Sequence, residues 1–186
     1  MKRRHKIGVI GNLVLFQALW FTTVLGAAAG EVRPALAVLV LLLAWGPLTG
    51  SLTGSSAGRD LRLVCFGVAL GAVVELLWVL PGLIEYRLQP VSWLPPPWIL
   101  LLWAGLAVSF HYSLSWLQGR PGLAAVFGAV GGVCSMAAGI RFGAASAPLG
   151  MVPLLVVYGL VFSLLVPLLA WRARAIWSDN AETMAG

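Results

Sequence analysis

The fold of this protein is decided by residues 61–83, which read LRLVCFGVALGAVVELLWVLPGL. After Arg62, the stretch holds a single charged side chain, Glu75. A bilayer core about 30 Å thick is crossed by roughly 20 mostly apolar helical residues. The stretch therefore predicts a membrane-spanning helix that carries a carboxyl group within its length.

Five further apolar runs lie between polar or Gly/Pro-rich breaks, at about residues 7–29, 35–50, 98–117, 122–141 and 149–171. The composition agrees, because 60% of the 186 residues are hydrophobic and only 10% are charged, whereas a soluble domain carries roughly 25% charged residues. A water-soluble domain and a disordered chain are both excluded. We expect an all-α fold, a polytopic six-helix membrane bundle forming one domain, with a polar cytoplasmic tail at residues 172–186.

The placement of Lys and Arg predicts the orientation, because cytoplasmic segments retain positive charge. With six helices, both termini and the second and fourth loops share one side, which carries nine of the 12 Lys and Arg residues. We therefore expect both termini in the cytosol and the chain in a bacterial inner membrane. The net charge of +6 then follows from topology, and no basic soluble face remains for nucleic acid.

The N-terminus has a competing interpretation as a secretory signal peptide. Positive residues precede an apolar run that ends in Ala27-Ala28-Ala29, which resembles a cleavage site. The run is longer than the usual apolar segment of about 7–15 residues, and Asn12 and Gln17 interrupt it. We expect the first helix to be retained.

Small residues four apart predict where helices pack, because helix association in lipid relies on close backbone approach. The predicted packing positions are Gly67, Gly71, Gly128, Gly132, Gly139 and Gly143. A shift of 61 residues aligns Gly67 and Gly71 with Gly128 and Gly132. The alignment indicates either a repeated helical hairpin or chance matching in a Gly-rich chain.

Two ionisable side chains lie deep in predicted spans, Glu75 and His111. Such groups cost roughly 2.5–3.5 kcal/mol on insertion scales. Glu75 follows Gly67 and Gly71 at a spacing of four, which predicts that it faces other helices. A rise of 1.5 Å per residue separates Glu75 from His111 by roughly 10 Å along the membrane normal, too far for a direct bond. The predicted polar track comprises Asn12, Gln17, Glu75, His111, Ser115 and Ser135.

This track has two interpretations. In one, it lines a site for a polar head group, an ion or a proton. In the other, it is a set of interhelical hydrogen bonds, each worth around 0.6 kcal/mol. Asn12, Ser115 and Ser135 fit the structural interpretation better, Glu75 fits the functional one, and His111 fits both.

Recognisable catalytic and metal-binding patterns are missing from the sequence. No common hydrolase, nucleotide-binding or zinc motif occurs, two histidines exclude a multi-His metal centre, and no predicted span carries a lysine. We expect no catalytic residue, no metal, no cofactor and no enzymatic activity.

Residues spread along the chain carry a family likeness: Asn12, Phe16-Gln17, Trp20-Phe21, Trp103, residues 113–117 (SLSWL), Gly128, Gly131-Gly132, Gly139 and Gly143. With them, nearly the whole chain resembles the small bacterial inner-membrane family called domain of unknown function 2878. The resemblance implies a fold and a location, and no activity. The chain departs from the family pattern by having His111-Tyr112 where the family has Asn-His, and Glu75 where Asp is common.

A second, fainter likeness is to the tryptophan-rich sensory family, on Trp93, residues 95–97 (PPP), Trp98 and Trp103. It implies a tetrapyrrole or sterol ligand, although that family has five helices and three predicted spans precede the motif here.

The expected function is to bind or move a lipid-like or small amphipathic molecule, with Glu75 as the central polar contact. The alternative is a structural or accessory subunit that docks other membrane proteins through its Gly-rich faces. A membrane-embedded enzyme comes third. Membrane lipids are expected partners, and the sequence fixes neither the ligand nor the oligomeric state.

Overall fold

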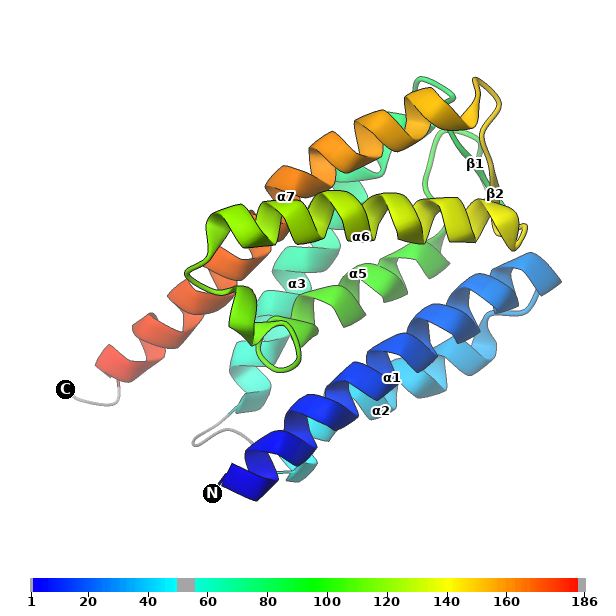
Figure 1. Ribbon diagram of the computed structural model, residues 1–186. Helices are drawn as coiled ribbons and strands as arrows, with labels where there is room; N and C mark the ends of the chain where they lie inside the picture. Colours follow the sequence, from blue (N-terminus) through cyan, green and yellow to red (C-terminus); the bar gives the residue numbers. More distant parts are fainter. Residues whose placement is uncertain (1, 50–55, 184–186) are drawn as a thin grey trace.

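Helices dominate the protein in a computed structural model that describes residues 2–49 and 56–183, and the side chains of residues 5–49 and 57–178. The elements in chain order are α1 (Lys2–Ala29), α2 (Arg33–Thr49), α3 (Ser56–Val74), α4 (Leu76–Val79), β1 (Glu85–Tyr86), α5 (Pro97–Ser109), the 3-10 helix η1 (Ser115–Leu117), α6 (Pro121–Arg141), β2 (Ala145–Ser146) and α7 (Met151–Thr183) (Figure 1). The predicted all-α fold is confirmed.

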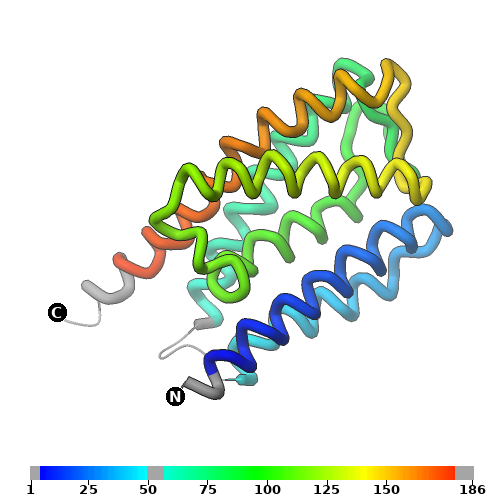
Figure 2. Tube along the Cα trace, in the orientation of Figure 1, coloured from blue at the N-terminus to red at the C-terminus, as the bar shows by residue number. Residues whose placement is uncertain are grey.

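The long helices pack as three neighbouring pairs, α1 with α2, α3 with α5, and α6 with α7. Contacts of α5 with α1 and of α3 with α7 join the pairs into one bundle. The start of α1 and the end of α7 lie at the same end of this bundle, and the β1–β2 ribbon closes the opposite end (Figures 1 and 2).

Four helical segments are long and apolar enough to cross a membrane: His5–Ala29, Ala57–Val79, Pro121–Arg141 and Met151–Ser178. Their outward side chains are apolar, with Val152 at 73% and Leu164 at 74% exposure, as a lipid-facing surface requires. The helices α2 and α5 are shorter, at 17 and 13 residues. A membrane-type helical fold is therefore established, whereas the count of exactly six spans stays a prediction.

The helix limits differ from the predicted ones in two places. The predicted helix over residues 61–83 ends at Val79, because Pro81 and Gly82 follow and neither continues a helix. The prediction of a helix through residue 117 is wrong after Ser109. Beyond that point, Leu114 N donates to Ser109 O, and Gln118 Nε2 donates to Phe110 O. These contacts replace the regular backbone hydrogen bonds of an α-helix.

Four of the six predicted packing glycines form close helix contacts. A Cβ at Gly67 or Gly71 would overlap Ala107 or Trp103 of α5, and one at Gly128 or Gly132 would meet Phe162 of α7. Each glycine pair thus contacts the long helix that follows it, while the repeat itself stays a prediction.

The packing prediction is wrong for the other two glycines. A Cβ at Gly139 or Gly143 would meet no atom within 4 Å. Gly143 has φ +83° and follows the end of α6, where a left-handed residue ends the helix. Gly143 therefore forms a turn and is not a packing position.

Some predictions concern residues or side chains that lie outside the described part of the chain. These are the end of the second predicted span at Gly50, the positive side chains of Lys2, Arg3 and Arg4, and residues 184–186 of the predicted tail. The rest of that tail, from residue 172 to Thr183, continues α7 as helix.

Candidate functional site

Glu75 lies where α3 meets α4, and its side chain is fully buried. The helix continues through it, because Glu75 N donates to Gly71 O at 2.9 Å and Val79 N donates to Glu75 O at 3.1 Å. Residues three and four apart share one face of a helix, so Gly71, Glu75 and Trp78 all face the interior. The predicted inward orientation of Glu75 is observed.

Three neutral donors hold the carboxylate of Glu75. Trp103 Nε1 donates to Oε1 at 2.9 Å. Tyr86 OH donates to Oε2 at 2.6 Å, and Trp78 Nε1 donates to the same oxygen at 2.5 Å. Hydrogen bonds to a carboxylate stabilise its negative charge. Both oxygens are thus held in fixed positions in the centre of the bundle.

Each donor reaches Glu75 for a reason visible in the chain. Trp78 lies one helical turn further on. Trp103 comes from α5. Its indole packs over Gly71 of α3, where a Cβ on residue 71 would overlap the ring. Tyr86 belongs to β1, which pairs antiparallel with β2 so that Tyr86 lies opposite Ala145. Three separate elements therefore converge on one carboxyl group.

The Tyr86 hydroxyl keeps its proton. Burial, followed by the negative charge of Glu75, raises the pKa of the Tyr86 phenol well above its ordinary value. Tyr86 therefore stays a hydrogen-bond donor to Glu75 throughout the physiological pH range.

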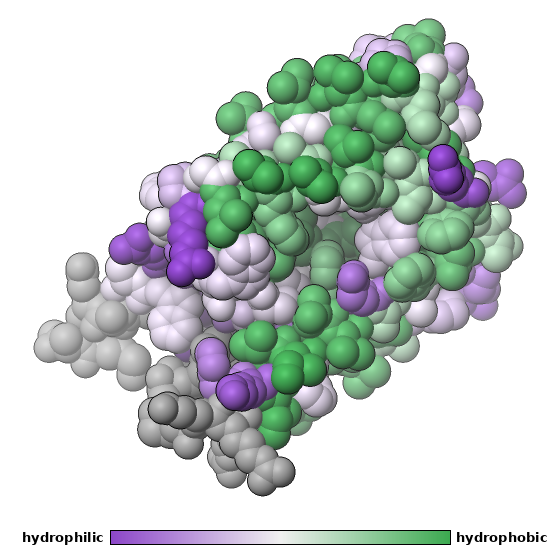
Figure 3. Space-filling model, viewed as in Figure 1, coloured by the Kyte–Doolittle hydropathy of each residue, from purple (hydrophilic) through white to green (hydrophobic). Residues whose placement is uncertain are grey.

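A pocket of about 410 Å³ adjoins Glu75. It is lined by residues of four long helices: Phe16, Gln17, Trp20 and Phe21 of α1; Ile99, Leu102, Trp103 and Leu106 of α5; Phe127, Gly128, Gly131, Gly132, Cys134, Ser135 and Ala138 of α6; and Tyr158, Phe162 and Val166 of α7. The lining is mostly apolar, and Glu75 is the only acidic side chain among the described residues that form it. Figure 3 shows the hollow between α6 and α1 on an otherwise largely apolar face.

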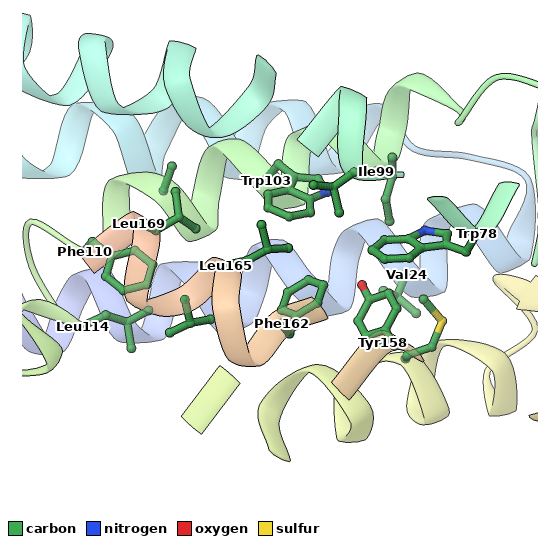
Figure 4. Close-up of a cluster of buried hydrophobic side chains, with 14 of the residues drawn as sticks. Val24, Trp78, Ile99, Trp103, Phe110, Leu114, Tyr158, Phe162, Leu165 and Leu169 are labelled. Atoms are coloured by element: carbon green, nitrogen blue, oxygen red, sulfur yellow. The ribbon is translucent and has the colours of Figure 1, made fainter. Parts of the chain in front are cut away.

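Aromatic rings that line the pocket or bond Glu75 pack together in the buried cluster that Figure 4 shows. Tyr158 and Phe162 stack with their centroids 4.4 Å apart, and Trp103 lies 5.6 Å from Phe162. Trp78 packs on Tyr158 at 4.7 Å. Because these rings fix one another, the wall around the carboxylate is rigid.

One hydrogen bond bridges α1 and α6 beside the pocket. Trp20 Nε1 donates to Ser135 Oγ at 2.8 Å. Both residues also line a second, smaller hollow of about 50 Å³, which extends toward Tyr86 and Ala145. The Trp20–Ser135 bond therefore lies between the main pocket and the end of the bundle that carries the β-ribbon.

A second buried polar cluster surrounds Asp60 of α3. Its Oδ1 lies 2.7 Å from His111 Nδ1, and its Oδ2 accepts from Tyr112 OH at 2.6 Å. Nearby, Asn12 Oδ1 accepts from Ser113 Oγ at 2.6 Å. This cluster joins α1, α3 and the turns after α5, so it ties the bundle together at the end that holds the start of α1.

The predicted track therefore divides into separate groups. Glu75, Gln17 and Ser135 line the pocket, whereas Asn12 and His111 belong to the second cluster. The side chain of Ser115 has one described hydrogen bond, from Oγ to the nearby carbonyl of Tyr112. Glu75 and His111 have different partners, in agreement with the predicted separation.

Sequence reasoning missed Asp60 and the three aromatic donors. Asp60 lies between Arg59 and Leu61 at the start of an apolar run, and its place beside two arginines is typical of a solvated loop. The feature that could have revealed Asp60 is a carboxylate placed one helical turn after the start of α3, a helix that contains no Lys. Trp78 carried a signal in its spacing of three residues from Glu75. Nothing in the sequence linked Tyr86 or Trp103 to Glu75, because tyrosine and tryptophan are common at membrane interfaces.

No three metal-ligating side chains come together within the parts of the chain that the structure describes. The family model described as "Protein of unknown function (DUF2878)" matches residues 9–168, and the predicted resemblance is thereby confirmed. No curated protein and no solved structure matches the chain.

Proposed function

The chain belongs to the DUF2878 family of proteins of unknown function, and we propose that this member binds a small amphipathic, lipid-like molecule in the pocket beside Glu75. The observation that carries the proposal is a largely apolar hollow with one fully buried carboxylate in its wall.

The size and chemistry of the pocket support this function. Ligand pockets commonly enclose about 300–1,000 Å³ and combine an apolar lining with a few fixed polar groups. Here the volume is about 410 Å³ and the fixed polar group is Glu75, held by three donors. A membrane protein seldom keeps an intramembrane carboxyl group without a functional reason.

The smaller hollow supports an extension of the proposal from binding to movement. It shares Trp20, Ser135 and Tyr158 with the main pocket and reaches the residues of the β-ribbon. A molecule that left the main pocket along this route would pass the Trp20–Ser135 bond. The bond would then be broken and reformed in each passage.

The alternative function, docking of other membrane proteins through Gly-rich faces, finds less support. Gly67, Gly71, Gly128 and Gly132 contact α5 or α7 of the same chain. They are occupied within the protein and offer no surface to a partner.

The proposed location is a bacterial inner membrane, with lipids around the bundle and both termini in the cytosol. It is supported by the excess of Lys and Arg on one side and by the position of the start of α1 and the end of α7 at one end of the bundle (Figure 1).

Filling the pocket tests the binding function. Gly131 lines the pocket, and a Cβ there would meet no atom within 4 Å, so Gly131→Trp is expected to fill the hollow without disturbing the fold. The test uses three decyl compounds with ammonium, maltoside or sulfate heads, added to protein held in an uncharged amphipathic polymer that contains no detergent. At one hundred times Kd, binding stabilises a protein by about 2.7 kcal/mol.

We expect at least one decyl compound to raise the thermal unfolding midpoint of the natural chain and to have no effect on Gly131→Trp. Gly122→Trp is the matched control, because Gly122 also lies on α6 with open space around it and outside the pocket. Equal midpoint shifts in both variants, or no shift in the natural chain, would contradict the proposed function.

A further inference from the structure

Resting on the proposed function, we propose that the ligand is an amphipathic amine whose positively charged head binds Glu75 and the aromatic wall while its apolar tail leaves between α1 and α6.

The carboxylate of Glu75 has no described partner of opposite charge. The described contacts between acidic and basic side chains are Glu31–Arg33 and Asp60–His111, and neither includes Glu75. Its three described partners are neutral donors, and the described lining of the pocket holds no Lys, Arg or His. A buried charge is costly unless it is paired with a charge of opposite sign and hydrogen-bonded. A cationic head supplies that partner, and an anionic head would be repelled.

The buried carboxylate of Glu75 also has an acceptor lone pair that no described hydrogen bond uses. An ionised carboxylate offers about four lone-pair sites on its two oxygens. Oε2 accepts two hydrogen bonds, from Trp78 and Tyr86, whereas Oε1 accepts one, from Trp103. Oε1 therefore keeps a lone pair that no described hydrogen bond uses. The N–H of a protonated amine would donate to it, and its positive charge strengthens the bond.

The aromatic rings that line the pocket add a preference for a cation. The faces of aromatic rings attract cations, most strongly when water is excluded. Trp103, Tyr158 and Phe162 line the same pocket as Glu75 and pack against one another, as Figure 4 shows. Tyr158 and Phe162 use one face each in their mutual stack, and the remaining ring surface beside the carboxylate favours an ammonium head over a neutral polar one.

The route of the tail follows from the open side of the pocket. Phe21 of α1 and Phe127 of α6 line the pocket and are 48% and 39% exposed. The hollow opens between these helices on an apolar face (Figure 3). An alkyl tail would therefore lie against phenylalanine side chains and continue into the lipid. Shortening such a tail is expected to weaken binding about fourfold per methylene removed.

The native cysteines provide a readout that does not depend on activity. Cys134 is exposed and lines the pocket, whereas Cys65 is exposed and lies outside it. In a Cys65→Ser background, the rate at which N-ethylmaleimide modifies Cys134 reports whether the pocket is occupied. The probes are decylammonium, decyl maltoside and decyl sulfate, with the protein in the uncharged polymer.

We expect decylammonium to slow the modification of Cys134 at least tenfold, and to bind at least tenfold more tightly than decyl maltoside or decyl sulfate. Glu75→Gln is expected to weaken decylammonium binding about 10- to 100-fold, because a charge-assisted hydrogen bond is lost, and to weaken decyl maltoside binding much less. If Glu75→Gln does not fold, the comparison of the three heads in the natural site still decides.

Equal protection by decyl maltoside or decyl sulfate would overturn the amine assignment and leave the binding function standing. Protection by none of the three would overturn both.

Discussion

Glu75→Ala is expected to lower the free energy of unfolding by about 3–5 kcal/mol. Three buried donors, Trp78 Nε1, Tyr86 OH and Trp103 Nε1, would lose their only described acceptor, and each orphaned donor costs about 1–3 kcal/mol. Relief of the desolvation cost of the carboxylate offsets part of this loss. The unfolding midpoint in denaturant, followed by tryptophan fluorescence, measures the effect.

Two further variants control this experiment. Glu85→Ala removes an exposed carboxylate from the neighbouring β1 and is expected to change stability by less than about 0.5 kcal/mol. Glu75→Gln keeps one acceptor oxygen and the side-chain volume, so its loss should be smaller than that of Glu75→Ala. If Glu75→Ala were as stable as Glu85→Ala, the carboxylate would not organise the three aromatic donors.

Asp60→Ala is expected to lower the free energy of unfolding by about 2–4 kcal/mol. His111 Nδ1 and Tyr112 OH are both buried and both bond the Asp60 carboxylate, so the substitution leaves two groups without that partner. Because these bonds join α3 to the turns after α5, the loss should appear in the same global unfolding transition.

Glu31→Ala is the matched control for Asp60→Ala. Glu31 Oε1 lies 3.9 Å from Arg33 Nε, and both side chains are more than half exposed. Exposed ion pairs contribute at most about 1 kcal/mol. Equal effects of the two substitutions would show that the Asp60 cluster is not a structural tie. A stability loss confined to Asp60→Ala would support its role.

The sequence predicted the membrane-type fold because hydrophobic length and charge placement are local properties. Residues 61–83 and 122–141 each contain enough apolar residues to define a span on their own, and α3 and α6 occupy most of these ranges. The inward position of Glu75 was also predictable, since its spacing from Gly67 and Gly71 follows from helix geometry alone.

Two of the three partners of Glu75, Tyr86 and Trp103, were not predictable, because they depend on tertiary contacts. Trp103 is 28 residues away in the chain and Tyr86 is 11. Helical periodicity says nothing about which indole reaches which carboxylate across a bundle. The same reason hid Asp60, whose contacts with His111 and Tyr112 span 51 and 52 residues.

The end of α5 shows how tertiary bonds override local pattern. Residues 110–117 are apolar enough to continue a helix, yet Ser113 N donates to Asn12 Oδ1 of α1, at 3.3 Å. Once a backbone donor is taken by a distant side chain, the helical ladder cannot use it. His111 and Ser115 of the predicted polar track therefore lie on a turn and on η1.

The central claim is that the pocket beside Glu75 holds an amphipathic molecule. Native mass spectrometry of protein extracted directly from membranes tests it, with Gly131→Trp and Gly122→Trp measured beside the natural chain. We predict one bound species of defined mass on the natural chain and on Gly122→Trp, and none on Gly131→Trp. The same bound species on all three chains, or a natural chain that carries none, would contradict the claim.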